Sequence, residues 1–379
     1  MVESRVAPAP HRVRSMDTLR ALVVAWVIAG HALLGYSTLG GWVYDQVAEV
    51  RFEPGVELAL VTLLGPTGLF LMGTFFLIAG MFTPAALATN GPGEFLRRRL
   101  RRLGLPFAVT VVLIWPATVW LAYRASGRSR TYLSLVTGDR LLHAGALWFA
   151  EVLLIFSVGY LVWCLAFGRS TRSLAVRGRH LALLATGIAV VSFVLRLRLP
   201  ARASGPGDLH LWQWPQLAGM FILGIAGGRQ MATRVRDGLV RACGAIALVT
   251  VASLPLLATL AGVHHVSSDS APYLGGWHWQ AAALAVVEAT LTVAGSVWLV
   301  GFAQRHFEGS GTAVVHAADR AAFAAFVLQN PILVALAVAL RPVSAPAEVK
   351  APLVAVLGVA GCFLLGHVLV TRTPLSRIL

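Results

Sequence analysis

The chain has 379 residues, of which 57% are hydrophobic and 12% are charged, and its formal net charge is +15. Its mean hydropathy is +0.75. A soluble globular domain carries about 25% charged residues, so this composition excludes one. Apolar stretches long enough to cross a bilayer recur along the whole sequence. We therefore expect an all-α polytopic membrane protein, with a basic cytoplasmic tail over residues 1–16 and one membrane domain over 17–379.

Hydropathy indicates about ten transmembrane helices separated by short connections rich in Gly, Pro and Arg. They are expected at about 17–37, 56–83, 104–123, 146–167, 181–199, 210–228, 239–262, 278–303, 319–340 and 352–371. If the N-terminus is cytoplasmic and the sides alternate, most of the 31 Lys and Arg residues fall in cytoplasmic segments. The positive-inside rule then predicts that both termini are cytoplasmic, and it explains the charge without a nucleic-acid partner.

The first predicted span contains two unusual residues, Arg20 and His31. Eleven helical steps make about 1,100°, close to three turns, so both side chains lie on one stripe, roughly 16 Å apart along the axis. A cation and an imidazole within an apolar helix indicate a functional site. Histidine can act as a general base near neutral pH. The alternative is that Arg20 is a positive-inside anchor and His31 an interhelical hydrogen-bonding residue.

A dense cationic patch lies between the second and third predicted spans. Arginine occupies positions 97–99, 101 and 102. Guanidinium groups bind phosphate bidentately, so the patch can dock a donor that carries phosphate. Without further context, a topology determinant or a patch for anionic lipid headgroups is the favoured interpretation.

Three carboxylates lie near or within predicted spans. Glu57 is near the outer start of the second, Glu151 lies in the fourth, three residues after Trp148, and Glu288 is near the middle of the eighth. Residues three apart share a similar helix face. Each carboxylate can orient a base or pair with a buried arginine such as Arg196. For any one of them, a structural ion pair is at least as favoured as a catalytic role.

Aromatic and histidine residues gather on the expected outer side. The tryptophans there are Trp42, Trp120, Trp212, Trp214, Trp277 and Trp279. They predict an interfacial aromatic belt, or faces that stack on a sugar or another bulky acceptor. The loop with His264, His265, Asp269 and His278 lacks the spacing of a helical histidine pair, so no metal site is predicted.

Two stretches resemble signatures of the membrane acyltransferase-3 family, integral membrane O-acyltransferases that modify glycans and related acceptors. The run from Asp17 and Arg20 to His31 is similar to the family's arginine-to-histidine signature. The run Phe75-Phe-Leu-Ile-Ala-Gly-Met-Phe82 is similar to its second-span motif. In this order and spacing the two motifs are specific, and the likeness extends from Asp17 to the C-terminus.

Later similarities are looser. Arg99 and Arg102 resemble the family's cytoplasmic arginine pair, and the run Leu147-Trp-Phe-Ala-Glu151 resembles its Leu-Trp-Phe stretch. The run Trp214-Pro-Gln216, with Gly224 downstream, is similar to a further pattern.

The ninth span departs from the family pattern. Relatives often show an aromatic residue, two further residues and a histidine before proline, whereas this chain reads Phe326-Val-Leu-Gln329-Asn-Pro331. Glutamine cannot act as a base. Because His31 remains, we expect Gln329 to alter acceptor choice and not to abolish the chemistry.

The resemblance implies an enzyme of the cell (inner or plasma) membrane that uses cytoplasmic acyl-CoA, most simply acetyl-CoA. The implied donor-binding residues are Arg20, Arg98, Arg99 and Arg102. His31 is then the general base or a transient nucleophile, with Glu151 as a second catalytic residue, and the residues leave both routes open.

The implied acceptor is an extracytoplasmic polysaccharide, a glycolipid or a secreted small molecule. Trp148, Trp212 and Trp214 are the candidates to bind it. A transporter or flippase of a lipid-linked or small-molecule substrate is the competing class, because it too has many spans with intramembrane Glu and His. Paired halves with matching broken helices, typical of transporters, are not evident in the sequence.

Overall fold

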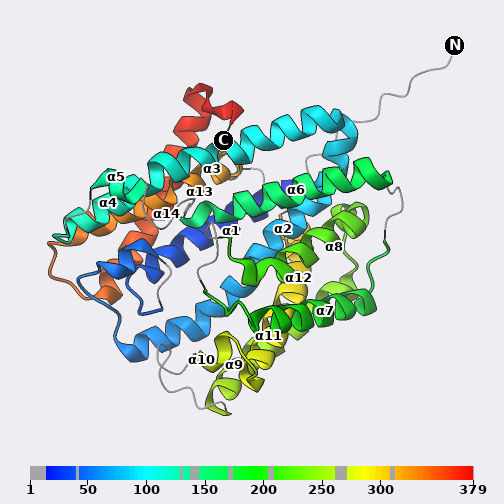
Figure 1. Ribbon diagram of the computed structural model, residues 1–379, viewed down its shortest axis with the longest axis horizontal. Coiled ribbons are helices and arrows are strands. Elements are labelled where there is room, and N and C mark those ends of the chain that lie inside the picture. Colours follow the sequence, from blue (N-terminus) through cyan, green and yellow to red (C-terminus); the bar gives the residue numbers. More distant parts are fainter. Residues whose placement is uncertain are drawn as a thin grey trace.

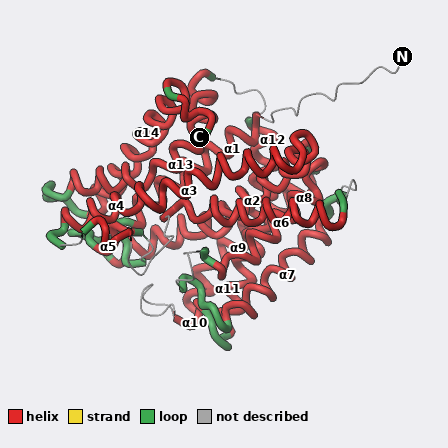
Figure 2. The backbone as a smooth tube through the Cα atoms, turned by 45° about the horizontal axis from the view of Figure 1, so that its top comes forward, coloured by secondary structure: helices red, strands yellow, loops and turns green. Residues whose placement is uncertain are grey.

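The computed structural model describes residues 14–39, 42–128, 131–136, 145–169, 174–203, 209–260, 271–307 and 312–378. Within these ranges the chain is helical with short connections, as Figure 2 shows, and the all-α prediction is confirmed. The α-helices are α1 (Arg14–Leu34), α2 (Pro54–Arg99), α3 (Leu105–Val109), α4 (Trp115–Ala125), α5 (Tyr132–Val136), α6 (Trp148–Phe167), α7 (Gly178–Arg196), α8 (Trp214–Thr233), α9 (Asp237–Leu260), α10 (Ala271–Leu274), α11 (Trp279–Thr290), α12 (Ser296–His306), α13 (Ala313–Leu340) and α14 (Ala347–Arg372). Short 3-10 helices are η1 (Val43–Gln46), η4 (Gly145–Leu147), η6 (Leu211–Gln213) and η8 (Pro374–Arg377), and π-helical turns are η2 (Leu100–Gly104), η3 (Thr110–Ile114) and η7 (Leu291–Gly295).

Each of the ten predicted ranges overlaps a helix, but eight helical stretches of the described residues are long and apolar enough to cross a membrane. Two differences explain why there are eight such stretches and not ten. The stretch Pro54–Ala125 contains both the second and the third predicted range. Helix α8 is not among the eight, because polar residues such as Gln216 and Arg229 lie near its two ends. Helix α8 is instead packed inside the protein, where much of its length is buried.

The long stretch from Pro54 to Ala125 reverses direction at Gly91. Gly91 has φ 73° and ψ 169°, a conformation that side chains with a Cβ rarely adopt, and Pro92 then opens the returning helix. Figure 1 shows α2 crossing the molecule and the chain coming back through α3 and α4. The arginine-rich segment 97–102 therefore forms the first turns of the returning helix.

Helices α2 and α8 approach each other closely through glycines. A Cβ added at Gly80 would overlap the backbone oxygen of Phe221, and one added at Gly224 would overlap the backbone oxygen of Leu77. Small residues at such crossings allow membrane helices to pack backbone against backbone. Gly80 and Gly224 belong to two of the motifs that carry the family resemblance, so the structure brings these motifs into contact.

Large apolar side chains cover much of the outer surface of the helices. Trp163 and Phe167 on α6, Leu248 on α9 and Leu364 on α14 are each at least 60% exposed. In water such extensive apolar exposure would promote aggregation, whereas in a bilayer these side chains face lipid tails. The protein is a multi-pass membrane protein.

Candidate active site

Helix α1 carries both Arg20 and His31 and packs against α13 and α14. Nδ1 of His31 lies 2.7 Å from Oε1 of Gln329 on α13. Nε2 of Gln329 donates a hydrogen bond of 3.0 Å to the carbonyl oxygen of Phe326, which fixes the amide so that its oxygen faces the imidazole. An amide oxygen only accepts hydrogen bonds, so Nδ1 is the donor and the lone pair of a neutral His31 is on Nε2.

Trp42 covers one face of the His31 ring. The two rings are stacked with their centroids 4.5 Å apart and their planes at 8°. Trp42 is buried, and its backbone N–H donates to Oδ2 of Asp45 in η1. The indole therefore comes from the connection after α1 and is held there by the next short helix. The contacts that the structure gives to the imidazole are therefore Gln329 at Nδ1 and Trp42 on one face.

A cavity of about 380 Å³ lies beside the arginine-rich segment. Its polar lining includes Asn90 and three of the predicted donor-binding residues, Arg98, Arg99 and Arg102. Its apolar lining includes Phe82 from α2 and Phe323 from α13. The structure thus gathers these arginines around one space of the size of a small-molecule site.

The cavity arginines are held in different ways. Nη2 of Arg99 donates to Oγ1 of Thr83 at 2.9 Å, and the guanidinium lies 5.3 Å from the centre of the Phe95 ring. Arg98 is 62% exposed and pairs with Glu94 at 2.7 Å. Arg102 is exposed. The cavity is therefore strongly electropositive, and Glu94 is the carboxylate that pairs with one of its lining arginines.

Arg20 belongs to the same end of the molecule. It pairs with Asp17 at 3.0 Å, and its guanidinium lies 5.5 Å from the centre of the Phe82 ring, which lines the cavity. The charge of Arg20, like that of Arg102, acts on Arg99. The structure therefore brings together the four arginines that the sequence analysis grouped as donor-binding residues.

The cavity and His31 are separate, and α13 connects them. Phe323 lines the cavity, and Gln329, six residues later on the same helix, contacts His31. Six helical residues rise about 9 Å. His31 does not line this cavity. The cavity and the imidazole thus contact α13 at points about 9 Å apart along its axis.

The predicted acceptor-binding tryptophans lie on other elements. Trp148 stacks on His210 with ring centroids 4.4 Å apart, and Trp212 lies 6.4 Å from the same imidazole. Trp214 donates from Nε1 to the carbonyl oxygen of Leu209. His210 itself has φ 47° and ψ 46°, a left-handed conformation that is uncommon for a residue other than glycine. Trp148 begins α6 and His210 immediately precedes η6, so their stacking arises from tertiary packing.

Helix α6 connects this aromatic cluster with the His31 site. Phe149, which follows Trp148, packs edge-to-face on Phe326 with centroids 4.6 Å apart. The carbonyl oxygen of Phe326 is the acceptor that holds Gln329. Phe149 of the Leu-Trp-Phe stretch therefore packs on the part of α13 that holds Gln329 against His31.

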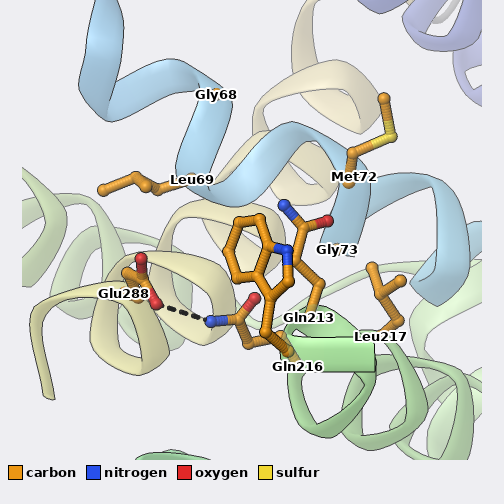
Figure 3. Close-up of a pocket in the computed structure, with 9 residues that line it drawn as sticks. Gly68, Leu69, Met72, Gly73, Gln213, Gln216, Leu217 and Glu288 are labelled. Atoms are coloured by element: carbon orange, nitrogen blue, oxygen red, sulfur yellow. Dashed lines mark hydrogen bonds between the residues drawn. The ribbon is translucent and has the colours of Figure 1, made fainter. Parts of the chain in front are cut away.

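A second buried polar cluster contains Arg196, Glu288 and Gln216. Arg196 is wholly buried and forms an ion pair with Glu288 through Nη2 and Oε2. Nε2 of Gln216 donates to the same carboxylate oxygen at 2.8 Å, as Figure 3 shows. Gln216 and Glu288 line a cavity of about 30 Å³, enough for a single water molecule. Glu288 therefore takes the role of an ion-pair partner for Arg196.

The other two carboxylates have different surroundings. Glu57 is buried and accepts hydrogen bonds from the hydroxyl groups of Ser37 and Thr38, so it holds the connection after α1. Glu151 lies half-buried in the first turn of α6. The polar partner that the structure gives to Nδ1 of His31 is Gln329. The predicted metal-free loop with His264, His265 and Asp269 lies outside the described residues, as does most of the basic tail.

Taken together, these features define a helical multi-pass membrane protein with a hydrogen-bonded imidazole on α1 and a cavity lined by arginines. The model of the acyltransferase-3 family, described as an acyltransferase domain, matches residues 13–370. The chain belongs to this family and is a membrane acyltransferase. Comparisons with curated proteins and with solved structures found no match.

Proposed function

We propose that this protein is an O-acyltransferase that moves an acyl group, most simply acetyl, from cytoplasmic acyl-CoA to a hydroxyl of an extracytoplasmic carbohydrate or related acceptor. The observation that supports this proposal most directly is the His31–Gln329 contact of 2.7 Å, which leaves Nε2 of a neutral imidazole as a base. The positive-inside rule supports the expected orientation, with the arginine cavity on the cytoplasmic side and both termini in the cytoplasm.

The arginine cavity is the proposed donor site. CoA carries several phosphate groups, and guanidinium forks bind phosphate through paired charge-assisted hydrogen bonds. Arg99 and Arg102 line the cavity without a carboxylate partner among the described residues. Arg98 also lines it but pairs with Glu94, and Arg20 lies over the ring of Phe82, which lines the cavity. An anionic ligand would relieve the mutual repulsion of these groups.

The thioester must reach His31 from this cavity. The pantetheine arm of CoA is long and narrow, so it can span the roughly 9 Å between the levels of Phe323 and Gln329 on α13. Phe323 lies at the start of that path. On this proposal its ring turns aside when the donor binds, and the thioester carbonyl then lies near Nε2 of His31.

Two routes can complete the transfer. In the first, Nε2 takes the proton of the acceptor hydroxyl while its oxygen attacks the thioester carbonyl; the C–S bond breaks, and the imidazolium returns the proton to the CoA thiolate. In the second, Nε2 attacks the carbonyl, the C–S bond breaks and CoA leaves as the thiolate; the acceptor oxygen then displaces the imidazole from the acyl group, and the hydroxyl proton ends on the CoA thiol. Both routes use the same nitrogen. Trp148, Trp212 and Trp214 are the proposed acceptor-binding residues, because indole faces stack on sugars and other flat apolar surfaces.

Mass spectrometry of surface glycans and secreted metabolites, with and without the gene, tests the function. We expect a product that is heavier by one acyl group only when the wild-type protein is present. His31→Ala should remove this product, since general-base catalysis contributes about 10²–10⁴-fold to rate. His306→Ala is the matched control, because His306 is largely exposed and bonds the carbonyl oxygen of Phe302 in its own helix. Full product formation by His31→Ala would refute the assignment.

A further inference from the structure

We infer that Gln329 is a positioning residue that holds His31 as the Nδ1–H tautomer and thereby makes Nε2 the reacting nitrogen. This inference rests on the proposed function and deepens it, because it assigns a role to the residue at which the chain departs from the family pattern.

The first argument is the hydrogen-bond direction. Gln329 is wholly buried, so water does not compete for its amide. Its NH₂ group is used by the carbonyl oxygen of Phe326 at 3.0 Å, which leaves the amide oxygen toward Nδ1 of His31 at 2.7 Å. Rotating the amide by half a turn would place two oxygens against each other at Phe326 and an NH₂ group against Nδ1. The observed arrangement satisfies both contacts and selects one tautomer.

The second argument is the enclosure of the ring. Trp42 is stacked at 4.5 Å on one face, and the amide blocks one edge. The imidazole can neither flip nor present Nδ1 to a substrate without breaking both contacts. In Ser-His-Asp triads, a hydrogen bond to Nδ1–H holds the catalytic imidazole in its tautomer and orientation in the same way.

The third argument concerns charge. A carboxylate in the position of Gln329 would stabilise the imidazolium, whereas a neutral amide orients the ring without adding a negative charge. The proton that His31 accepts is therefore held weakly and is readily passed to the departing thiolate. Gln329 thus supplies the orienting half of the role that a carboxylate has in a catalytic triad.

The direct test is NMR of the ring nitrogens in wild-type protein that contains isotope-labelled histidine. The His31 signals are identified by their loss in His31→Ala. We expect a protonated Nδ1 and an unprotonated Nε2 in the wild type, and a mixed or reversed pattern in Gln329→Leu. Gln329→Glu retains an acceptor oxygen and should keep Nδ1 protonated. A protonated Nε2 in the wild-type protein would overturn the inference, and this result does not depend on any activity or on the folding of a variant.

Steady-state release of free CoA from acetyl-CoA provides the second readout. In Gln329→Leu we expect kcat to fall at least about tenfold with little change in KM for acetyl-CoA, because the arginine cavity lies at another level. Gln329→Glu should recover part of kcat. Gln304→Leu is the matched control: Gln304 is also buried, but it bonds Val235 and Met231 at the end of α12.

The outcomes separate the two proposals. If Gln329→Leu keeps the wild-type tautomer and kcat while His31→Ala is inactive, the positioning role is wrong and the proposed function stands. If His31→Ala retains turnover while the wild-type tautomer is as expected, His31 is oriented by Gln329 but the proposed base is wrong.

Discussion

Arginine has opposite roles in two regions of this molecule. Arg196 is wholly buried, and one carboxylate, Glu288, neutralises it. Around the larger cavity, Arg99 and Arg102 lie close enough for their like charges to act on each other, and no carboxylate among the described residues pairs with either. A buried charge beside a carboxylate is neutralised without a ligand, whereas cations around a cavity that no carboxylate neutralises favour the binding of an anion. The comparison indicates that Arg196 stabilises the fold and that the cavity arginines bind an anionic ligand.

The largest expected effect is on stability, at the Arg196 cluster. Glu288→Ala leaves a charged guanidinium buried without its partner, which typically costs about 3–5 kcal/mol in free energy of unfolding. We expect a large drop in the thermal unfolding temperature of the purified protein. Replacing both members, as in Arg196→Met with Glu288→Leu, should restore much of that loss. If Glu288→Ala unfolds at the wild-type temperature, the structural role of the pair is wrong.

The next effect is on donor affinity, at the cavity. The double variant Arg99→Ala/Arg102→Ala should raise the dissociation constant for CoA by at least roughly tenfold, because each hydrogen bond to a charged group contributes about 1.5–3 kcal/mol. Isothermal titration measures the constant, and turnover at saturating acyl-CoA should change less. Thermal stability should be unchanged or increased, since the substitutions remove mutual repulsion. Arg97→Ala is the matched control, because Arg97 is exposed, pairs with Glu94 and does not line the cavity. An unchanged dissociation constant in the double variant would exclude the donor site.

The sequence predicted the parts of this site that depend on local spacing. Arg20 and His31 share one face of α1 because helical geometry requires it, and the arginine cluster was visible as a run. The partner of His31 was not predictable, because Gln329 is 298 residues away and meets it only through the packing of α1 on α13. The same holds for Trp42, which the sequence suggested for an aromatic belt and which instead stacks on His31.

The fold shows a similar division between local and tertiary information. Hydropathy located the helices, because lipid-facing segments must be apolar along their length. It did not predict that the second and third ranges form a nearly continuous stretch that reverses at Gly91. It also gave no sign that α8, although too polar for a typical span, lies inside the protein against α2. Burial of polar positions by neighbouring helices is a tertiary effect, and a hydropathy average over one segment does not record it.

The smallest effect concerns Arg98, which combines features of both regions. Arg98 lines the cavity, like Arg99, but it is paired with Glu94, and both side chains are partly exposed to solvent. Charge pairs between solvent-exposed groups contribute little free energy. Arg98→Ala should therefore change the dissociation constant for CoA by no more than about threefold. Glu94→Gln removes the negative charge at the rim while leaving every cavity arginine in place, and it should therefore tighten CoA binding modestly. Titrations at low and high salt provide the measurement, because the gain should disappear when exposed charges are screened. If Glu94→Gln instead binds CoA more weakly at low salt, Glu94 positions the arginines for the donor and does not simply offset their charge. Glu94 would then have a positioning role like that of Glu288, and the two regions would no longer differ in this respect.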